Sequence, residues 1–476
     1  ENCKLPIFVT NVYDEHHRLL TGADPETMCT ILEGLGVKAL GMNCSLGPEQ
    51  MKEIVPEFVD NISVPLIVTP NAGMPRSENG KTVYDITPDD FAKYMKDIAA
   101  QGAQVLGGCC GTTPAHIQAM IEALEGFEVV PVNKKNVGKI ASRNHAVAFK
   151  DKPVLIGERI NPTGKKKFKE ALRNHDMDYI LNEGLKQEEA GCDALDVNVG
   201  LPEINEVAMI EEVVKELQVV TDLPLQMDTT NPEAMEKALR VYNGKALINS
   251  INGKEEALHS ILPLVKKYGG VVVGLTLDEN GIPDTVEERI KIADKIYATA
   301  KEYGIDEKDI IIDPLAMAVS ADNNAAKVTL DTVKALKEQG RNSILGVSNV
   351  SFGLPAREVI TSTFFTLAMS HGLSAAIINP MSVPMKQAYQ GYLTLNGLDD
   401  KCLNYIELAS SFVTSTQVSV TQKSEVKEEG LRGAILKGLK NNAESATEAL
   451  LETMEPMKVI NEILIPALDE VGKGFE

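Results

Sequence analysis

Short apolar runs alternate with longer amphipathic stretches from about residue 5 to residue 380. The runs have the length of buried strands, and the stretches between them, such as 232–241 and 285–303, place apolar residues at helical spacing. This alternation is typical of repeated βα units around parallel strands. We therefore expect an α/β protein.

The alternation is interrupted twice. Residues 126–152 are polar and basic, and a second stretch at 412–427 is rich in Ser and Thr. Both read as linkers. We therefore predict a partial βα barrel, a linker, a complete barrel, a second linker and a short helical segment, over residues 1–125, 126–152, 153–411, 412–427 and 428–476.

Eight strand candidates follow the first linker, and eight is the number of strands that closes a (β/α)8 TIM barrel. They cover residues 153–160, 193–199, 223–229, 246–251, 270–277, 309–314, 343–349 and 374–379. Only four candidates precede this linker, at 5–11, 37–44, 65–71 and 104–109. Four strands leave an open edge, so we expect the first half of that barrel to precede residue 1.

The charge balance narrows the classes of function. A formal net charge of -21, from 68 acidic and 47 basic residues, repels nucleic acid and anionic membranes, so we expect neither as a partner. We find neither a membrane-length apolar run nor a signal-peptide pattern, and we expect a cytoplasmic protein. Seven cysteines in a chain of 476 residues suit a metal or catalytic role better than a disulfide framework.

Three cysteines stand at strand ends in glycine-rich sequence: Cys44 in Gly-Met-Asn-Cys-Ser-Leu-Gly-Pro, and Cys109 and Cys110 in Gly-Gly-Cys-Cys-Gly-Thr-Thr-Pro. Three thiolates around tetrahedral zinc leave the fourth position open, as in a catalytic site. A substrate thiol at that position is deprotonated at neutral pH. The alternative is that small cysteines simply pack in these loops.

Polar residues gather at the ends of the barrel strands, where such a barrel builds its site. They are Glu158, Asn198, Asp228, Asn249, Asp313 and Asn349. Asp and Asn side chains can pair the amide and aminopyrimidine edge of a pterin ring. Singly, each residue fits a helix cap or a turn equally well.

The cysteine motifs resemble the homocysteine-binding domain shared by cobalamin-dependent methionine synthases and betaine-homocysteine methyltransferases. The resemblance covers residues 1 to about 125 and matches the latter half of that domain. It implies that Cys44, Cys109 and Cys110 are zinc ligands and that the sulfur of homocysteine takes the fourth position.

The strand-end series from 153 to 411 resembles the pterin-binding family, and specifically the methyltetrahydrofolate domain of cobalamin-dependent methionine synthases. The resemblance implies that Asp228, Asn249 and Asp313 hold the pterin and that Asn349, near N5, acts with Asp313 in catalysis. It also implies further contacts to the ligand and its anionic tail from Glu158, Asn161, Gly164, Lys165, Lys166, Asn198, Ser351 and Arg357. The lysines at 165–167 can equally be a solvated surface run.

The reaction implied is methyl transfer from 5-methyltetrahydrofolate through cobalamin to zinc-activated homocysteine. Cobalamin is expected on a module outside this chain, because the part after Lys427 contains no histidine and resembles only the start of the helical cobalamin cap. The alternatives are a methyltetrahydrofolate:corrinoid methyltransferase, a dihydropteroate synthase and a non-catalytic folate-binding module.

Overall fold

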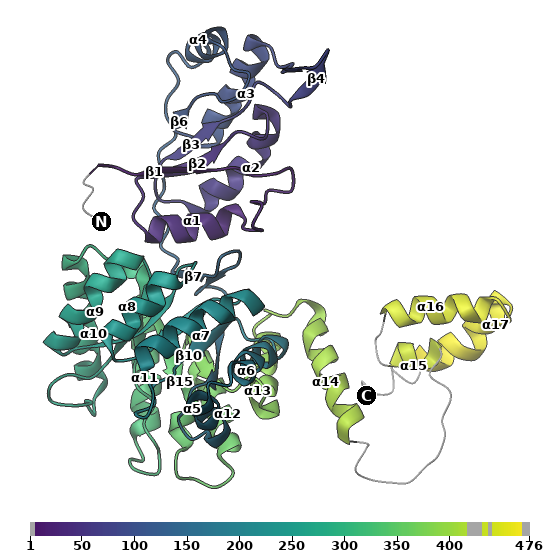
Figure 1. Cartoon of the computed structure of the whole chain (residues 1–476). Coiled ribbons are helices and arrows are strands. Elements are labelled where there is room, and N and C mark those ends of the chain that lie inside the picture. Colours follow the sequence, from purple (N-terminus) through teal and green to yellow (C-terminus); the bar gives the residue numbers. More distant parts are fainter. Residues whose placement is uncertain (1–4, 417–430, 437–439, 469–476) are drawn as a thin grey trace. The chain divides into compact units, whose positions relative to one another are not determined.

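The computed structural model describes residues 5–416, 431–436 and 440–468 (Figure 1). The chain forms two compact units, Glu1–Tyr405 and Ile406–Glu476. The first unit contains an open parallel sheet and a closed barrel. Both candidate sites lie on this unit.

The N-terminal sheet is parallel, with strand order β1-β2-β3-β6. Its strands lie inside the four predicted ranges: β1 (Phe8–Asn11), β2 (Ala39–Asn43), β3 (Leu66–Thr69) and β6 (Val105–Leu106). The helices between and after them are α1 (Pro25–Gly34), α2 (Pro48–Asn61), α3 (Pro88–Gln101) and α4 (Pro114–Ala123). Each helix begins with proline, whose fixed φ suits the first helical position.

A small hairpin that the sequence pattern did not reveal lies between β3 and α3. Its strands are β4 (Arg76–Glu78) and β5 (Lys81–Val83). Tyr13, Phe58 and Phe91 are fully buried in the core beneath the main sheet. This core holds the strand ends that carry the cysteines.

Eight parallel strands close the barrel, as predicted. They are β9 (Val154–Ile160), β10 (Ala194–Val197), β11 (Leu225–Asp228), β12 (Leu247–Asn252), β13 (Val271–Leu275), β14 (Ile310–Asp313), β15 (Asn342–Gly346) and β16 (Ala375–Ile378). β16 pairs with β9, which closes the ring. The fold class is therefore the predicted (β/α)8 barrel preceded by a partial βα sheet.

Helices surround this barrel and cover its strands. In chain order they are α5 (Lys166–Asn174), α6 (Met177–Glu189), α7 (Glu206–Val220), α8 (Pro232–Val241), α9 (Glu255–Tyr268), α10 (Val286–Glu302), α11 (Ala325–Glu338), α12 (Arg357–Ser370) and α13 (Val383–Leu395). In the sequence they are followed by α14 (Leu403–Thr416). Short 3-10 turns add η1 (Glu307–Asp309), η2 (Val347–Ser351) and η3 (Asp400–Cys402). Side-chain caps such as Asn205 and Thr285 fix where the helices begin.

The segment 126–152, which we expected to be a linker, contains an antiparallel hairpin, β7 (Lys139–Ala141) and β8 (Ala146–Ala148). Ile140, Val147 and Phe149 are buried among the side chains at the amino-terminal ends of the barrel strands. The Tyr242 hydroxyl donates to the carbonyl of Ala141 at 2.9 Å. Much of this segment is thus the floor of the barrel.

The second unit contains α15 (Leu431–Leu436), α16 (Lys440–Leu451), α17 (Pro456–Val459) and η4 (Ile460–Leu464), in line with the helical segment expected after 428. Of the second predicted linker, 412–416 belong to α14 and 417–427 lie outside the described residues. Among the helices of the described ranges, none has the length and apolar character needed to cross a membrane.

Candidate functional site

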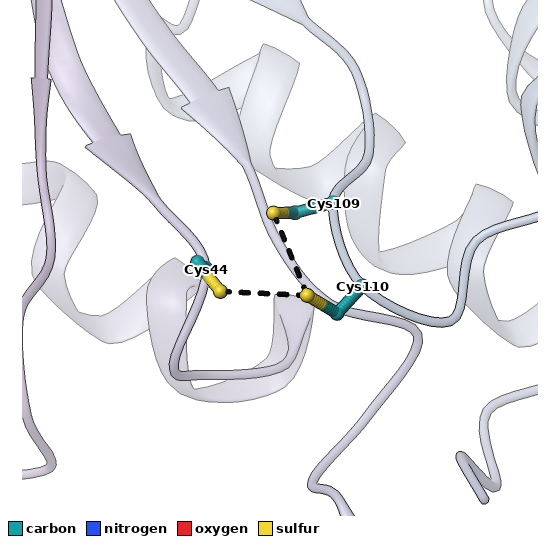
Figure 2. Close-up of side chains that lie close together, drawn as sticks. All are labelled: Cys44, Cys109 and Cys110. Carbon is teal, nitrogen blue, oxygen red and sulfur yellow. Dashed lines mark hydrogen bonds between the residues drawn. The ribbon is translucent and has the colours of Figure 1, made fainter. Parts of the chain in front are cut away.

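The three strand-end cysteines meet at one edge of the N-terminal sheet (Figure 2). Their sulfur atoms all lie within 4.8 Å of one another. The Sγ of Cys110 is 3.7 Å from that of Cys44 and 4.0 Å from that of Cys109. Since a Zn–S bond of about 2.3 Å in tetrahedral geometry separates two sulfurs by about 3.8 Å, the cluster fits a zinc ion.

The cluster is open on one side. Cys110 is exposed, whereas Cys44 and Cys109 are partly buried. The backbone N–H of Ser45 is the main cause that lowers the pKa of Cys44, while burial raises the pKa of Cys109. Both Cys44 and Ser45 have left-handed backbones, with φ of 59° and 65°, so the chain turns sharply at the end of β2.

Hydrogen bonds hold the loop that carries the cysteine pair. The Cys110 amide donates to Oδ1 of Asn71 at 3.1 Å, and its carbonyl accepts from the Ala72 amide at 2.9 Å. Gly111 has φ of 81°, and a Cβ there would lie 2.3 Å from the ring of Tyr84. Asn71 and Tyr84 were not among the site residues predicted from the sequence. Only the position of Asn71 at the end of a predicted strand could have indicated it.

In the barrel, Asp228 ends β11 and is the centre of a hydrogen-bonded group. Its Oδ2 accepts from Nδ2 of Asn198 at 3.0 Å and from Nδ2 of Asn161 at 3.5 Å. Three predicted site residues from β11 and the ends of β9 and β10 therefore lie together. Burial raises the pKa of Asp228.

A second carboxyl lies deeper in the barrel. Asp196 is 2% exposed and accepts a hydrogen bond of 2.6 Å from Nε2 of Gln226, which is fully buried. Burial, and next the charge of Asp228, raise the pKa of Asp196 well above its usual range. Neither Asp196 nor Gln226 was among the site residues predicted from the sequence. The signal was the spacing of Gln226 and Asp228, which places both on one face of β11.

Asp313 ends β14, and its Oδ1 accepts from the Leu315 amide at 2.7 Å. Desolvation raises the pKa of Asp313 to about 7, against the opposing effects of this hydrogen bond and of Arg289. Asn249 is partly buried, and its carbonyl accepts from the Thr229 amide at 3.1 Å. Asp313 lies at the carboxyl end of its strand, as predicted. Asn249 lies inside β12, which continues to Asn252, and it pairs with Asp228 at the end of β11.

Hydrogen bonds join β9 to the loop after β15. The Ser348 hydroxyl donates to Oε2 of Glu158 at 3.2 Å. Arg357 donates from Nε to Oγ of Ser351 at 3.1 Å and from Nη2 to the carbonyl of Ser348 at 2.7 Å. Asn349 lies between these residues in η2 and is exposed. Arg357 therefore braces the turn that presents Asn349.

The lysines that follow β9 differ in their surroundings. Nζ of Lys165 donates to the carbonyl of Glu158 at 2.7 Å, and burial lowers the pKa of Lys165. Lys166 is exposed at the start of α5, and Gly164, with φ of 72°, is also exposed. Only Lys165 is held against the barrel by a hydrogen bond to another predicted site residue.

Comparison with known protein families gives three matches in order along the chain. Residues 1–124 match the family model of homocysteine S-methyltransferase. Residues 157–379 match that of the pterin binding enzymes, and residues 427–476 match that of a B12 binding domain.

Two curated relatives align with nearly the whole chain. Methionine synthase of Mycobacterium leprae (strain TN) is 29% identical over 508 residues, and that of Mycobacterium tuberculosis (strain ATCC 25618 / H37Rv) is 28% identical over 501 residues. Each alignment covers 99% of this chain and 42% of the relative. The chain thus spans less than half the length of these relatives.

Among solved structures, dihydropteroate synthase from Xanthomonas albilineans is similar, with a TM-score of 0.43 and 22% identity over 54% of this chain and 98% of that one. The enzyme from Yersinia pestis has a TM-score of 0.43 and 16% identity, with the same coverage. The three family models thus match in succession along the chain, and the chain is similar to these methionine synthases over 99% of its own length.

Proposed function

We propose that this chain takes part in methyl transfer from 5-methyltetrahydrofolate, through cobalamin, to homocysteine, with methionine and tetrahydrofolate as products. The observation that carries the proposal is that one chain holds both a polar barrel mouth within a pterin-binding match and a three-thiol cluster within a homocysteine S-methyltransferase match. The activity belongs to the longer relatives, so it is proposed here for the domains that this chain shares with them.

The barrel mouth supports pterin binding because it offers acceptors and donors side by side. Asp228 is an acceptor held in place by Asn161 and Asn198. Asn249 on the adjacent strand β12 and Asp313 at the end of β14 add further polar groups. Such a set can pair both edges of the pterin, and we propose that Glu158, Lys165 and Arg357 line the rest of the ligand path.

Methyl transfer from a tertiary amine requires a proton on N5, because the neutral amine is a poor leaving group. A carboxyl with a pKa of about 7, as in Asp313, can hold or release a proton at neutral pH. We propose that Asp313 and Asn349 together stabilise the protonated N5. The exposed position of Asn349 at the mouth suits a group that meets the ligand where the methyl group departs.

At the other site, Cys44, Cys109 and Cys110 would hold zinc. Bound zinc would supply a Lewis acid that keeps a substrate thiol deprotonated at neutral pH. The exposed side at Cys110 would admit the thiol. Cobalamin would be held by a B12 binding domain, whose family model matches residues 427–476.

We propose the domain boundaries 1–125, 153–411 and 428–476, with the barrel floor supplied by the hairpin β7–β8. We also propose a cytoplasmic location. Thiols left unpaired at the metal cluster favour a reducing compartment.

Isothermal titration with methyltetrahydrofolate, followed by stopped-flow mixing with cob(I)alamin, tests this function. We expect saturable binding by the chain and methyl transfer to the added corrinoid. Methionine formation without added cobalamin should be undetectable. Absence of folate binding would overturn the proposal, and binding without methyl transfer would favour a non-catalytic folate-binding module.

A further inference from the structure

Arg289 is a buried cation whose place in the barrel the proposed reaction leaves unexplained. It lies in the first turns of α10 and is 2% exposed. Within the described residues, no ion pair involves Arg289. A buried guanidinium without a carboxylate partner has a large desolvation cost, which hydrogen bonds must offset.

The hydrogen bonds of Arg289 converge on the loop that leaves β14. Its Nη1 donates to the carbonyls of Pro314 and Leu315, at 2.6 and 3.2 Å. Its Nε donates to the carbonyl of Pro283 at 2.9 Å, on the loop before α10. Nη1 also lies 3.3 Å from Oγ1 of Thr329, which itself donates to the carbonyl of Leu315 at 3.0 Å.

These contacts fix the peptide that supports Asp313. Leu315 has a left-handed backbone with φ of 66°, a conformation that costs a branched residue free energy unless its surroundings hold it. Its amide donates to the Asp313 carboxylate, while its carbonyl is held by Arg289 and Thr329. The amide of Thr276, directly after β13, donates to the carbonyl of Asp313 at 3.0 Å.

We infer that Arg289 is a positioning residue, which clamps the β14 exit loop so that the Asp313 carboxylate faces the mouth of the barrel in a single orientation. The inference rests on the proposed function, in which Asp313 meets the pterin. We assign Arg289 a positioning role because the hydrogen bonds from its Nε and Nη1 go to loop carbonyls and Thr329. The charged groups that act on it are Asp313 and Asp284, the latter exposed on the loop before α10.

The test compares Arg289→Met and Arg289→Lys with Lys291→Met, which alters an exposed lysine on the same helix. Methyltetrahydrofolate affinity is measured by calorimetry from pH 5.5 to 8.5, and circular dichroism checks that each variant is folded. We expect Arg289→Met to weaken binding about tenfold, Arg289→Lys to recover part of the loss and Lys291→Met to bind like the wild type. The midpoint of the pH dependence should move upward in Arg289→Met, because Asp313 loses a nearby positive charge.

Thr329→Val provides a second route if Arg289→Met does not fold, since it removes one hydrogen bond to the same loop and keeps the shape of the side chain. We expect it to weaken binding severalfold. Suppose that Asp313→Asn weakens binding, but Arg289→Met and Thr329→Val change neither the affinity nor the midpoint of its pH dependence. The proposed positioning role of Arg289 is then wrong. If Asp313→Asn itself has no effect, the proposed role of Asp313 in pterin binding fails instead.

Discussion

The raised pKa of Asp313 suits its proposed role near protonated N5, but the burial that raises this pKa reduces the stability of the fold. Desolvation raises its pKa to about 7, and the Leu315 amide and Arg289 offset only part of that cost. In the unfolded chain the carboxyl titrates near its ordinary value of 3.8. The folded state therefore binds the proton more tightly, and the contribution of Asp313 to stability falls as pH rises from about 4 to about 7.

Asp313→Asn should consequently stabilise the protein at pH 8, because the amide is neutral and still accepts from Leu315. The gain should shrink below pH 7 and vanish near pH 4, where the carboxyl is protonated in both states. Thermal unfolding at pH 5, 6, 7 and 8 measures this difference. A difference in melting temperature that does not change with pH would contradict the raised pKa.

Substitutions of Asp228 and Asn349 should affect folate binding and methyl transfer differently. Asp228→Ala leaves the amides of Asn161 and Asn198 without their common acceptor, and we expect folate binding to weaken by about 1–3 kcal/mol. Asn349→Ala should instead slow methyl transfer to cob(I)alamin more than it weakens binding, because the proposed contact of Asn349 to protonated N5 would be strongest in the transition state.

Calorimetry and single-turnover stopped-flow on the same preparations give the two quantities. Lys291→Ala, which alters an exposed lysine on α10 outside the predicted site, serves as the control. Equal losses of binding and rate in Asn349→Ala would assign this residue to ground-state binding alone.

At the level of elements, the hairpin β7–β8 is an integral part of the barrel. Its apolar residues fill the amino-terminal end of the barrel, which would otherwise expose Ile156, Leu247 and Ile311. Phe149→Ala should therefore destabilise the barrel by about 3–5 kcal/mol, the usual cost of removing a buried aromatic ring. Arg143→Ala, on the exposed turn of the same hairpin, should cost no more than about 1 kcal/mol.

Urea unfolding followed by circular dichroism measures both variants. A protein that begins at residue 153 should in addition be less stable than one that begins at residue 136. Equal unfolding midpoints for these two proteins would show that the hairpin is dispensable.

On the scale of the whole molecule, the metal site is the feature that can be measured without any substrate. Chain purified under reducing conditions should bind close to one zinc, and Cys109→Ser should lose tight binding because two thiolates remain. Cys402→Ser, which alters an exposed thiol outside the cluster, should keep its zinc. Metal analysis after dialysis against a weak chelator distinguishes the variants. Equal zinc content in the wild type, Cys109→Ser and Cys402→Ser would contradict the assignment of the three cysteines as zinc ligands.

The sequence alone determined the number and order of the barrel strands and the placement of Cys44, Asp228 and Asp313 at strand ends. These features are local, because apolar runs, turn residues and strand ends are encoded by neighbouring residues. The sequence also indicated that the chain joins a pterin-type barrel to a thiol cluster, since each motif lies within a few residues of a strand end.

Only the tertiary structure decided which distant groups support these sites. The hairpin β7–β8 looked like a linker because its few buried residues are spread through basic sequence, and it is held by Tyr242, 101 residues away from Ala141. Arg289 gave no reliable signal either, and the spacing that places Gln226 on the same face of β11 as Asp228 did not reveal that Gln226 is buried beside Asp196. The burial of a polar side chain depends on what packs around it in three dimensions, and neighbouring residues in the sequence do not specify that environment.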